Sequence, residues 1–243
     1  ILDLKVLHIE AESYIYYNSS KVESVDGLRS EVIQGLTTYS NSIDLNKFGG
    51  RFKYSKVLAV IDNISDAITS NITRIRMRRN LNALVNQFAQ YELCFGNQFN
   101  VKPGGFNIKS TGFKILGVDS TVYLTDIPDS NQKTGTVEIV REDITDGSKI
   151  VIVENAGTVD YMKGEINLTT INITSTDKEN NIIEVQAFPE SNDVIGLQDL
   201  YLKFSIADSS INMVKDTITS GEQISGLGYN VTSSYNNGEL TRE

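Results

Sequence analysis

The sequence is poor in the side chains that most often carry catalysis or bind transition metals. Its 243 residues include one cysteine, Cys94, one histidine, His8, and no tryptophan. A lone cysteine cannot form an internal disulfide, and the apolar residues around Cys94 would not stabilise a thiolate, so we expect a buried structural cysteine. A Ser-His-Asp triad could use only His8, and no Gly-x-Ser-x-Gly elbow is present to expose a serine. We therefore predict no catalytic residues.

Motifs for cofactors and metal ions are also missing. The sequence has no Walker loop, no dinucleotide-binding glycine pattern and no helix-loop-helix calcium loop. Carboxylates lie close together at 126–131 and 143–147, but Asp and Asn are ordinary turn residues because their side chains bond to nearby backbone. The sequence therefore predicts no cofactor-binding and no metal-binding residues.

Charge and hydropathy exclude two further classes of partner. Lys and Arg total 22 against 31 Asp and Glu, a net charge of -9, which would repel a nucleic-acid backbone. The longest apolar run, residues 57–61, is far shorter than the roughly 20 residues that cross a bilayer. We expect neither nucleic acid nor a membrane as a partner.

Residues 1–90 show the pattern of a strand, two helices and a second strand. Leu2, Leu4 and Val6 alternate with polar residues, which indicates a strand with one buried face. Ser24 is a candidate N-cap for a helix whose apolar residues recur at spacings of three and four as far as Ile43, and a second helix is predicted at about 55–65. Strict alternation over residues 73–78 predicts the closing strand.

The rest of the chain has a β pattern followed by a polar tail. Short apolar runs separated by Gly-containing turns predict strands at 122–124, 137–140, 150–153, 166–173, 183–188 and 200–206. We therefore predict an α+β fold, with an N-terminal strand-helix-helix-strand module over 1–90 followed by a β-rich antiparallel module over 91–216. Residues 217–243 are rich in Ser, Gly and Asn, which predicts a flexible or partner-docked tail.

An arginine stripe stands out in this acidic chain, and it comprises Arg74, Arg76, Arg78 and Arg79. Alternation places Ile75 and Met77 on the opposite face of the strand. The stripe could be a solvated face, a protein interface or, less consistently with the net charge, a nucleic-acid site. We name the four arginines as candidate protein-interface residues, together with the tail tyrosines Tyr229 and Tyr235.

Three segments carry a resemblance to a known family. The run Gly-Gly-Arg-Phe-Lys-Tyr-Ser at 49–55, continuing through 62 and then through 68–72 into the arginine-rich strand, resembles the carboxy-terminal half of baseplate J-like proteins. Residues 157–166 and 188–194 resemble the β-rich end of the baseplate wedge proteins of T-even contractile-tailed phages. Because the chain begins with Ile1 and not Met, we expect it to be part of a longer polypeptide.

The resemblance implies a virion structural protein without enzymatic activity or cofactors. Such a protein would form a homodimer, join wedge to wedge in a ring, and contact other baseplate wedge and hub proteins. It would be assembled in the host cytoplasm, belong to the tail baseplate of the virion, and change its contacts on tail contraction and genome ejection.

Two other classes remain open at this stage. A β-rich adhesin or carbohydrate-binding domain would fit the Asn, Ser, Thr and Tyr content of the second module, although the lack of Trp argues against it. A glycosidase would need a carboxylate pair, which cannot be recognised in a sequence because the two groups meet only in space.

Overall fold

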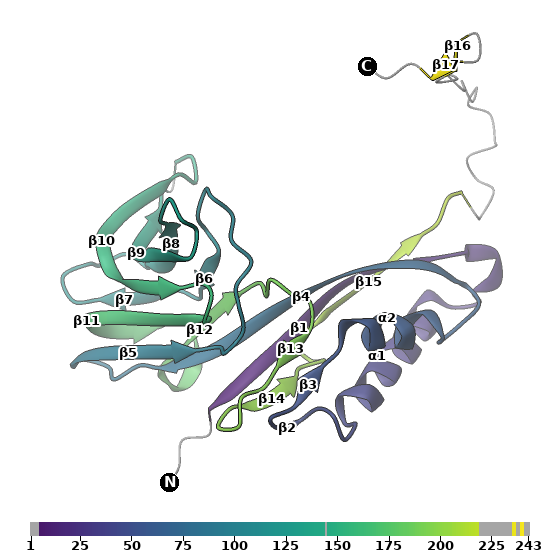
Figure 1. Cartoon of the computed structure of the whole chain (residues 1–243), viewed down its shortest axis with the longest axis horizontal. Coiled ribbons are helices and arrows are strands. Elements are labelled where there is room, and N and C mark those ends of the chain that lie inside the picture. The colour runs from purple at the N-terminus through teal and green to yellow at the C-terminus, as the bar shows by residue number, and fades with distance from the viewer. Residues whose placement is uncertain (1–4, 144, 219–234, 237–238, 241–243) are drawn as a thin grey trace.

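Two large β-sheets and two α-helices make up the part of the chain that the structure describes. The structure is a computed structural model that describes residues 5–143, 145–218, 235–236 and 239–240. We call the seven-stranded sheet, with strand order β2-β14-β1-β4-β12-β6 and β15 added beside β1, the long sheet. The six-stranded sheet, with order β5-β11-β10-β9-β8 and β7 added beside β11, is the curled sheet. Figure 1 shows the long sheet leading from the helices to the curled sheet.

Two long antiparallel strands form the centre of the long sheet. They are β1 (Val6–Tyr17) and β4 (Ile68–Asn82), in a register that sets Ile9 opposite Met77. Side chains alternate between the two faces of a strand, and one face here is mostly apolar, with Leu7, Ile9 and Met77 all buried. The closing strand predicted from alternation at 73–78 lies within β4. The predicted opening strand shares only Val6 with β1, and the buried apolar residues of β1 are Leu7 and Ile9, which are out of phase with Val6. Leu2 and Leu4 lie outside the described residues.

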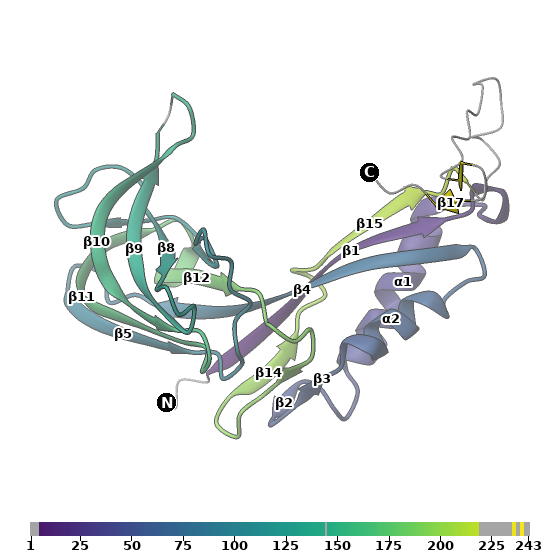
Figure 2. The same cartoon turned by 45° about the horizontal axis from the view of Figure 1, so that its top comes forward.

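Both helices, α1 (Val25–Ser40) and α2 (Tyr54–Asp62), pack on that apolar face (Figure 2). The predicted cap of α1 is confirmed, because Ser24 Oγ accepts a hydrogen bond of 3.1 Å from the amide of Gly27. Gly35 lets the two helices approach, since a Cβ there would lie 3.3 Å from Val60 Cγ1 in α2 and 2.6 Å from Ile64 Cδ1 just beyond it. Ile43, expected on the apolar stripe of α1, lies past the end of the helix and is 86% exposed.

Two short strands from the C-terminal part of the chain run parallel to β1 on its other side. β14 (Tyr201–Phe204) pairs with residues 6–9 and β15 (Ser210–Lys215) pairs with residues 12–17. Residues 205–209 form a loop between them. In this gap Ser209 Oγ accepts a hydrogen bond of 3.0 Å from the Ala11 amide. A side chain therefore provides the acceptor that a neighbouring strand would otherwise supply to this backbone N–H group.

The remaining strands of the long sheet lie at its two edges. β12 (Ile182–Ala187) pairs with β4, and β6 (Ile108–Ser110) pairs with β12. β2 (Lys47–Phe48) pairs with β14 at the opposite edge. A separate two-stranded ladder joins β3 (Arg51–Phe52) to β13 (Val194–Ile195).

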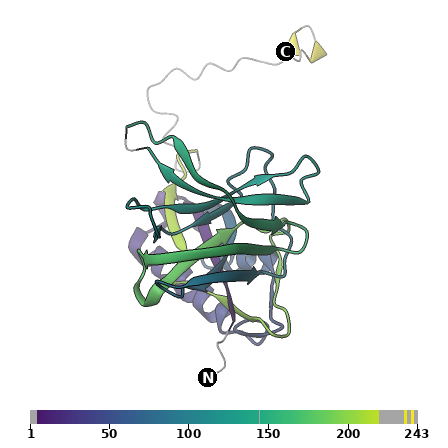
Figure 3. The ribbon, with the colours of Figure 1, turned by 90° about the vertical axis from the view of Figure 1, so that its left-hand side faces the viewer.

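The curled sheet is antiparallel throughout and bends back on itself. Its strands are β5 (Phe88–Cys94), β7 (Phe113–Ile115), β8 (Tyr123–Pro128), β9 (Thr134–Glu142), β10 (Lys149–Asp160) and β11 (Glu165–Thr176). β7 pairs with β11 on one side, and its residue Phe113 bridges to Val122, directly before β8, on the other. This bridge brings the two sides of the sheet together. Figure 3, viewed from the curled sheet, shows its strands in front of the helices.

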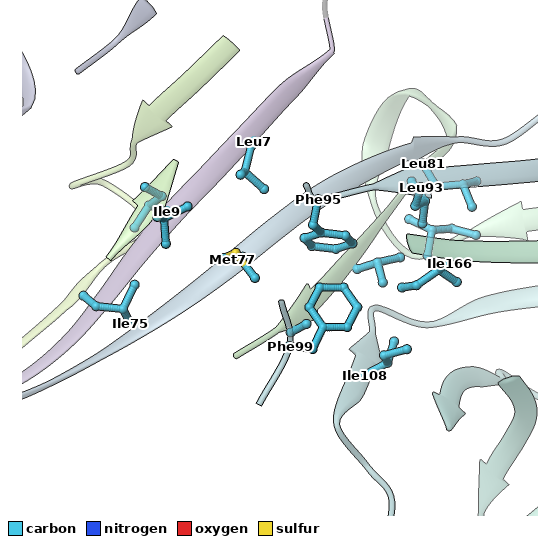
Figure 4. Close-up of a cluster of buried hydrophobic side chains, with 14 of the residues drawn as sticks. Leu7, Ile9, Ile75, Met77, Leu81, Leu93, Phe95, Phe99, Ile108 and Ile166 are labelled. Atoms are coloured by element: carbon cyan, nitrogen blue, oxygen red, sulfur yellow. The ribbon is translucent and has the colours of Figure 1, made fainter. Parts of the chain in front are cut away.

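One hydrophobic core connects the two sheets. Buried residues of the long sheet, among them Ile9 and Met77, belong to the same cluster as Phe95 and Phe99 at the junction and Ile166 in the curled sheet (Figure 4). The rings of Phe95 and Phe99 meet edge to face, with their centroids 5.0 Å apart. The two sheets therefore share buried apolar surface.

The predicted fold class is wrong. The described residues are mostly β-strand, in several sheets, with two α-helices between β1 and β4. The predicted strand-helix-helix-strand module does not stand alone, because β6, β12, β14 and β15 from the second half of the chain complete its sheet. The second half is also not purely antiparallel, since β14 and β15 run parallel to β1. The domain boundaries at 90 and 216 stay a prediction.

Candidate protein interface

The face of the long sheet that points away from the helices carries rows of opposite charge, and we call it the open face. Acidic and imidazole side chains alternate along β1, and arginines alternate along β4. The strand register sets each residue of one row opposite a residue of the other: His8 opposite Arg78, Glu10 opposite Arg76, and Glu12 opposite Arg74. Opposite charges directly across an antiparallel pair stabilise the sheet, so the predicted arginine stripe has an acidic partner row within the chain.

Arg78 lies at the centre of a buried ion cluster. Its side chain bonds through Nε to Glu10, through Nη1 to Glu184 at 2.9 Å, and through Nη2 to Asp208 at 2.7 Å. Arg78 is 4% exposed, and a buried guanidinium is tolerated only when it is paired in this way. Because these partners come from β1, β12 and the 205–209 loop, Arg78 joins three segments that are far apart in the sequence.

His8 lies beside this cluster and is neutral at physiological pH. Burial, followed by the positive charges of Arg78 and Lys203, lowers the pKa of His8 from 6.5 to about 4. Its Nδ1 lies 3.1 Å from Ser205 Oγ at the start of the 205–209 loop. Burial also raises the pKa of Glu10, and the guanidinium of Arg78 opposes that effect. The charged groups around Arg78 therefore act on one another in a partly buried environment and are not simply exposed to solvent.

The four candidate arginines fall into two pairs. Arg78 and Arg79 are buried, and Arg79 lies on the other face, where its Nη1 donates to the Val6 carbonyl at 2.8 Å. Arg76 is half-buried, with its Nη2 3.5 Å from Glu12 Oε2. Arg74 is exposed and forms no ion pair with any residue that the structure describes. Only Arg74 and Arg76 are therefore available to a partner in this conformation.

The two candidate tyrosines lie in the tail. Tyr229 is outside the described residues. Tyr235 begins the short strand β16 (Tyr235–Asn236), which pairs with β17 (Glu239–Leu240). The interface role of both tyrosines stays a prediction.

The first part of the chain matches a known family. Residues 5–80 match the model of a family described as baseplate structural protein gp6, C-terminal domain III. The match supports a structural role in a phage tail baseplate. No curated protein matches the chain. The matched segment holds β1, both helices and most of β4, so it contains both charged rows of the open face.

The acidic partners of Arg78 were missed by sequence reasoning. Glu10 and Glu12 have the period-2 spacing that would have predicted a charged strand face complementary to the arginine stripe. Glu184 and Asp208 carry no such signal, because they reach Arg78 only through the sheet topology. The sequence therefore indicated this cluster only through the alternating acidic residues of β1 and the alternating arginines of β4.

The carboxylates predicted to be turn residues have two different roles. Asp143 and Asp146 do hold a turn, where each accepts a hydrogen bond of 2.8 Å from the amide two residues on. The backbone bond from Thr145 lowers the pKa of Asp143, and the side-chain bond from Ser148, followed by its backbone bond, lowers the pKa of Asp146. For Asp126 the turn prediction is wrong. It is fully buried in β8, where Tyr161 Oη donates to it at 2.6 Å, the Asn107 amide at 2.8 Å and the Ile108 backbone amide at 2.8 Å.

The remaining candidates for chemistry are accounted for by structure. Cys94 lies in β5, where burial raises the pKa of its thiol and so keeps it protonated. No three His, Cys, Asp or Glu side chains gather as a possible metal site within the described part of the chain. Neither of its two α-helices is long and apolar enough to cross a membrane.

Proposed function

We propose that this chain is part of a baseplate wedge protein of the baseplate J-like type, which links subunits by self-association and transmits rearrangement when the tail contracts. The observation that carries the proposal is the family match over residues 5–80, which coincides with the open face. The proposed partners are a second copy of the chain, in a homodimer and a ring, and other wedge and hub proteins. The proposed location is the virion, after assembly in the host cytoplasm.

The composition of the open face supports a role in protein contact. Tyr14 and Ile72 lie opposite each other next to Arg74, and they are 38% and 54% exposed, respectively. An arginine beside an exposed aromatic and an exposed aliphatic side chain is typical of protein interfaces, whereas lysine and glutamate dominate ordinary solvated faces. This combination favours an interface over a purely solvated stripe.

The ion cluster supports the rearrangement part of the proposal. Arg78 ties the 205–209 loop to β4 through Asp208, whose side chain is half exposed. Switching proteins commonly exchange ion pairs at the edges of interfaces when their subunits move. A contact that displaces Asp208 would change how this loop is held, which gives a local route from a subunit contact to the C-terminal strands.

Sedimentation velocity of the chain, from low to high micromolar concentration, tests the proposal. We expect a concentration-dependent dimer, with an interface above roughly 1,000 Å² of total buried area. The double variant Ile72→Glu with Arg74→Glu should weaken the dimer at least tenfold, because it places like charges in the contact. Circular dichroism should be unchanged, since both side chains are exposed.

Arg29→Glu, on the exposed side of α1, is the control for an arginine charge reversal away from the open face and should leave association unaltered. Co-purification with neighbouring baseplate proteins tests the remaining partners. A chain that stays monomeric at all concentrations, and that captures no baseplate protein, would contradict the proposed role.

A further inference from the structure

A small cavity opens where three strands of the long sheet lie side by side. It has a volume of about 50 Å³ and is lined by Arg76, Asn107, Lys109, Gln186, Ala187 and Phe188. β12 lies between β4 and β6, and Gln186 pairs with Arg78 on one side and with Lys109 on the other. The cavity is therefore built by β4, β12 and the β6 region together, beside the ion cluster.

Its free polar groups are positively charged hydrogen-bond donors. The Nε of Arg76 is buried and has no hydrogen-bond partner. Lys109 is exposed and forms no ion pair with a described residue. The amide groups of the lining are already used: that of Gln186 donates to Glu10 at 3.0 Å, and that of Asn107 donates to Asp126. A ligand would therefore meet Lys109 and the unpartnered Nε of Arg76, whose Nη2 already lies 3.5 Å from Glu12 Oε2.

This donor set fits a carboxylate. A buried N–H without a partner is unfavourable, and more so when it belongs to a charged group, so a hydrogen-bond acceptor at Arg76 Nε would be favourable. A guanidinium binds a planar carboxylate through two parallel hydrogen bonds. A cavity of about 50 Å³ holds roughly three waters or one carboxylate group, which excludes larger anions from entering fully.

We propose that this cavity, the carboxylate socket, receives an aspartate or glutamate side chain from a second copy of the chain. The proposal rests on the self-association proposed above, and it identifies one contact between the copies: a carboxylate bound by Arg76 and Lys109. Charge supports a second copy as the source, because the 31 acidic residues of the chain, against 22 basic ones, offer many carboxylates to a cationic cavity. Arg74, two residues from Arg76 on the same face, extends the positive charge toward the rest of the contact.

The first test probes the socket directly with acetate. Nitrogen-15 NMR of the arginine Nε–H groups is recorded below the association threshold, while sodium acetate replaces sodium chloride at constant ionic strength. We expect a saturable shift of the Arg76 resonance and none at Arg29, the exposed control. The shift should be lost in Lys109→Gln if both cations hold the anion. No saturable shift at Arg76 would overturn the socket.

The second test asks whether the socket works between copies. Arg76→Gln and Lys109→Gln should each weaken self-association about tenfold, and acetate should compete with it, whereas Lys114→Gln on β7 should have no effect. Unfolding midpoints for all variants separate loss of the contact from loss of the fold.

The outcomes distinguish this inference from the proposed function. If the unaltered chain does not associate, self-association fails and the socket's partner fails with it. If the chain associates normally without Arg76 or Lys109, the interface lies elsewhere and only the socket is overturned. Acetate binding that leaves association unchanged also overturns the second-copy source, because the socket would then serve a different anion.

Discussion

The two sheets solve the problem of buried polar groups in different ways. In the curled sheet the buried carboxylate of Asp126 receives three hydrogen bonds, two of them from neutral side chains. In the long sheet the buried cation Arg78 is held by three carboxylates. The hydrogen bonds to Asp126 hold Asn107 and Tyr161 against β8 of the curled sheet. The ion pairs of Arg78 join segments that are distant in the sequence, and they do so at the partly exposed open face of the long sheet.

This difference indicates where the molecule can change. Antiparallel neighbours close the curled sheet locally, and the hydrogen bonds to Asp126 all come from within the chain. The long sheet is assembled from both ends of the chain, and its charges lie at the border of the open face. Buried ion pairs contribute little net stability but are costly to break, so they favour one arrangement of strands over others. We therefore expect the long sheet to respond to binding and the curled sheet to act as a rigid support.

The largest effect should come from removing the centre of the ion cluster. Arg78→Met would leave Glu10 buried without its cation, and we expect a loss of about 3–5 kcal/mol in the free energy of unfolding. Chemical denaturation measures the loss, and hydrogen exchange should show it in β1, β14 and β15 before the curled sheet. Arg74→Met is the matched control and should change stability by less than about 0.5 kcal/mol, because Arg74 is exposed. Equal effects of the two variants would show that the ion cluster adds nothing beyond an exposed arginine, and loss of exchange protection in the curled sheet first would contradict the distinction between the sheets.

The next largest effect should come from the curled sheet. Tyr161→Phe removes the donor to Asp126 while keeping the ring, which is fully buried. We expect a loss of about 1–3 kcal/mol, since a buried acceptor loses one of its bonds. Thermal unfolding measures this loss. Self-association should be unchanged, and a variant that weakened association as strongly as Arg76→Gln would show that the two sheets are coupled.

The sequence predicted local elements well and their assembly poorly. Alternation located β4, and side-chain capping located the start of α1, because both depend on neighbouring residues. β14 and β15 pair with β1 although they lie almost 200 residues further along the chain. Such long-range pairing produces no periodic pattern in the sequence. The candidate site shows the same limit: the arginine stripe was readable, but Glu184 and Asp208 were not. Sequence patterns could give the two charged strand faces of β1 and β4, but not the residues that reach Arg78 from β12 and the 205–209 loop.

The pH dependence of stability should sharpen the comparison, because His8 belongs only to the long sheet. Its pKa is about 4 when folded and 6.5 as the ordinary value, so between these values the unfolded chain binds more protons. Stability should therefore fall as the pH drops from 6.5 toward 4, by roughly 1–2 kcal/mol once solvent screening of this partly exposed group is allowed for.

Comparison with His8→Asn isolates this contribution to stability. The raised pKa of Glu10 acts in the opposite direction, because the folded state then binds the extra proton, and it is present in both proteins. Arg78, Arg79, Lys203 and Asp208, which act on His8, are also unchanged in the variant. The difference between the two pH profiles of urea unfolding should rise from pH 4 to 6.5 and be flat above. A flat difference throughout would mean that His8 is solvated and that the cluster is more open than the structure shows.

The smallest effect should come from the helical layer that covers the long sheet. Ser24→Ala removes the side-chain acceptor for the Gly27 amide, and we expect a loss of about 1 kcal/mol, with faster amide exchange in the first turn of α1. Ser24→Asp is the matched control and should restore most of the loss, because a carboxylate caps the same amide and interacts favourably with the helix dipole. The open face lies on the other side of the sheet, so neither variant should alter self-association. If Ser24→Ala weakened the dimer while Ser24→Asp did not, the helices and not the open face would form the contact between copies.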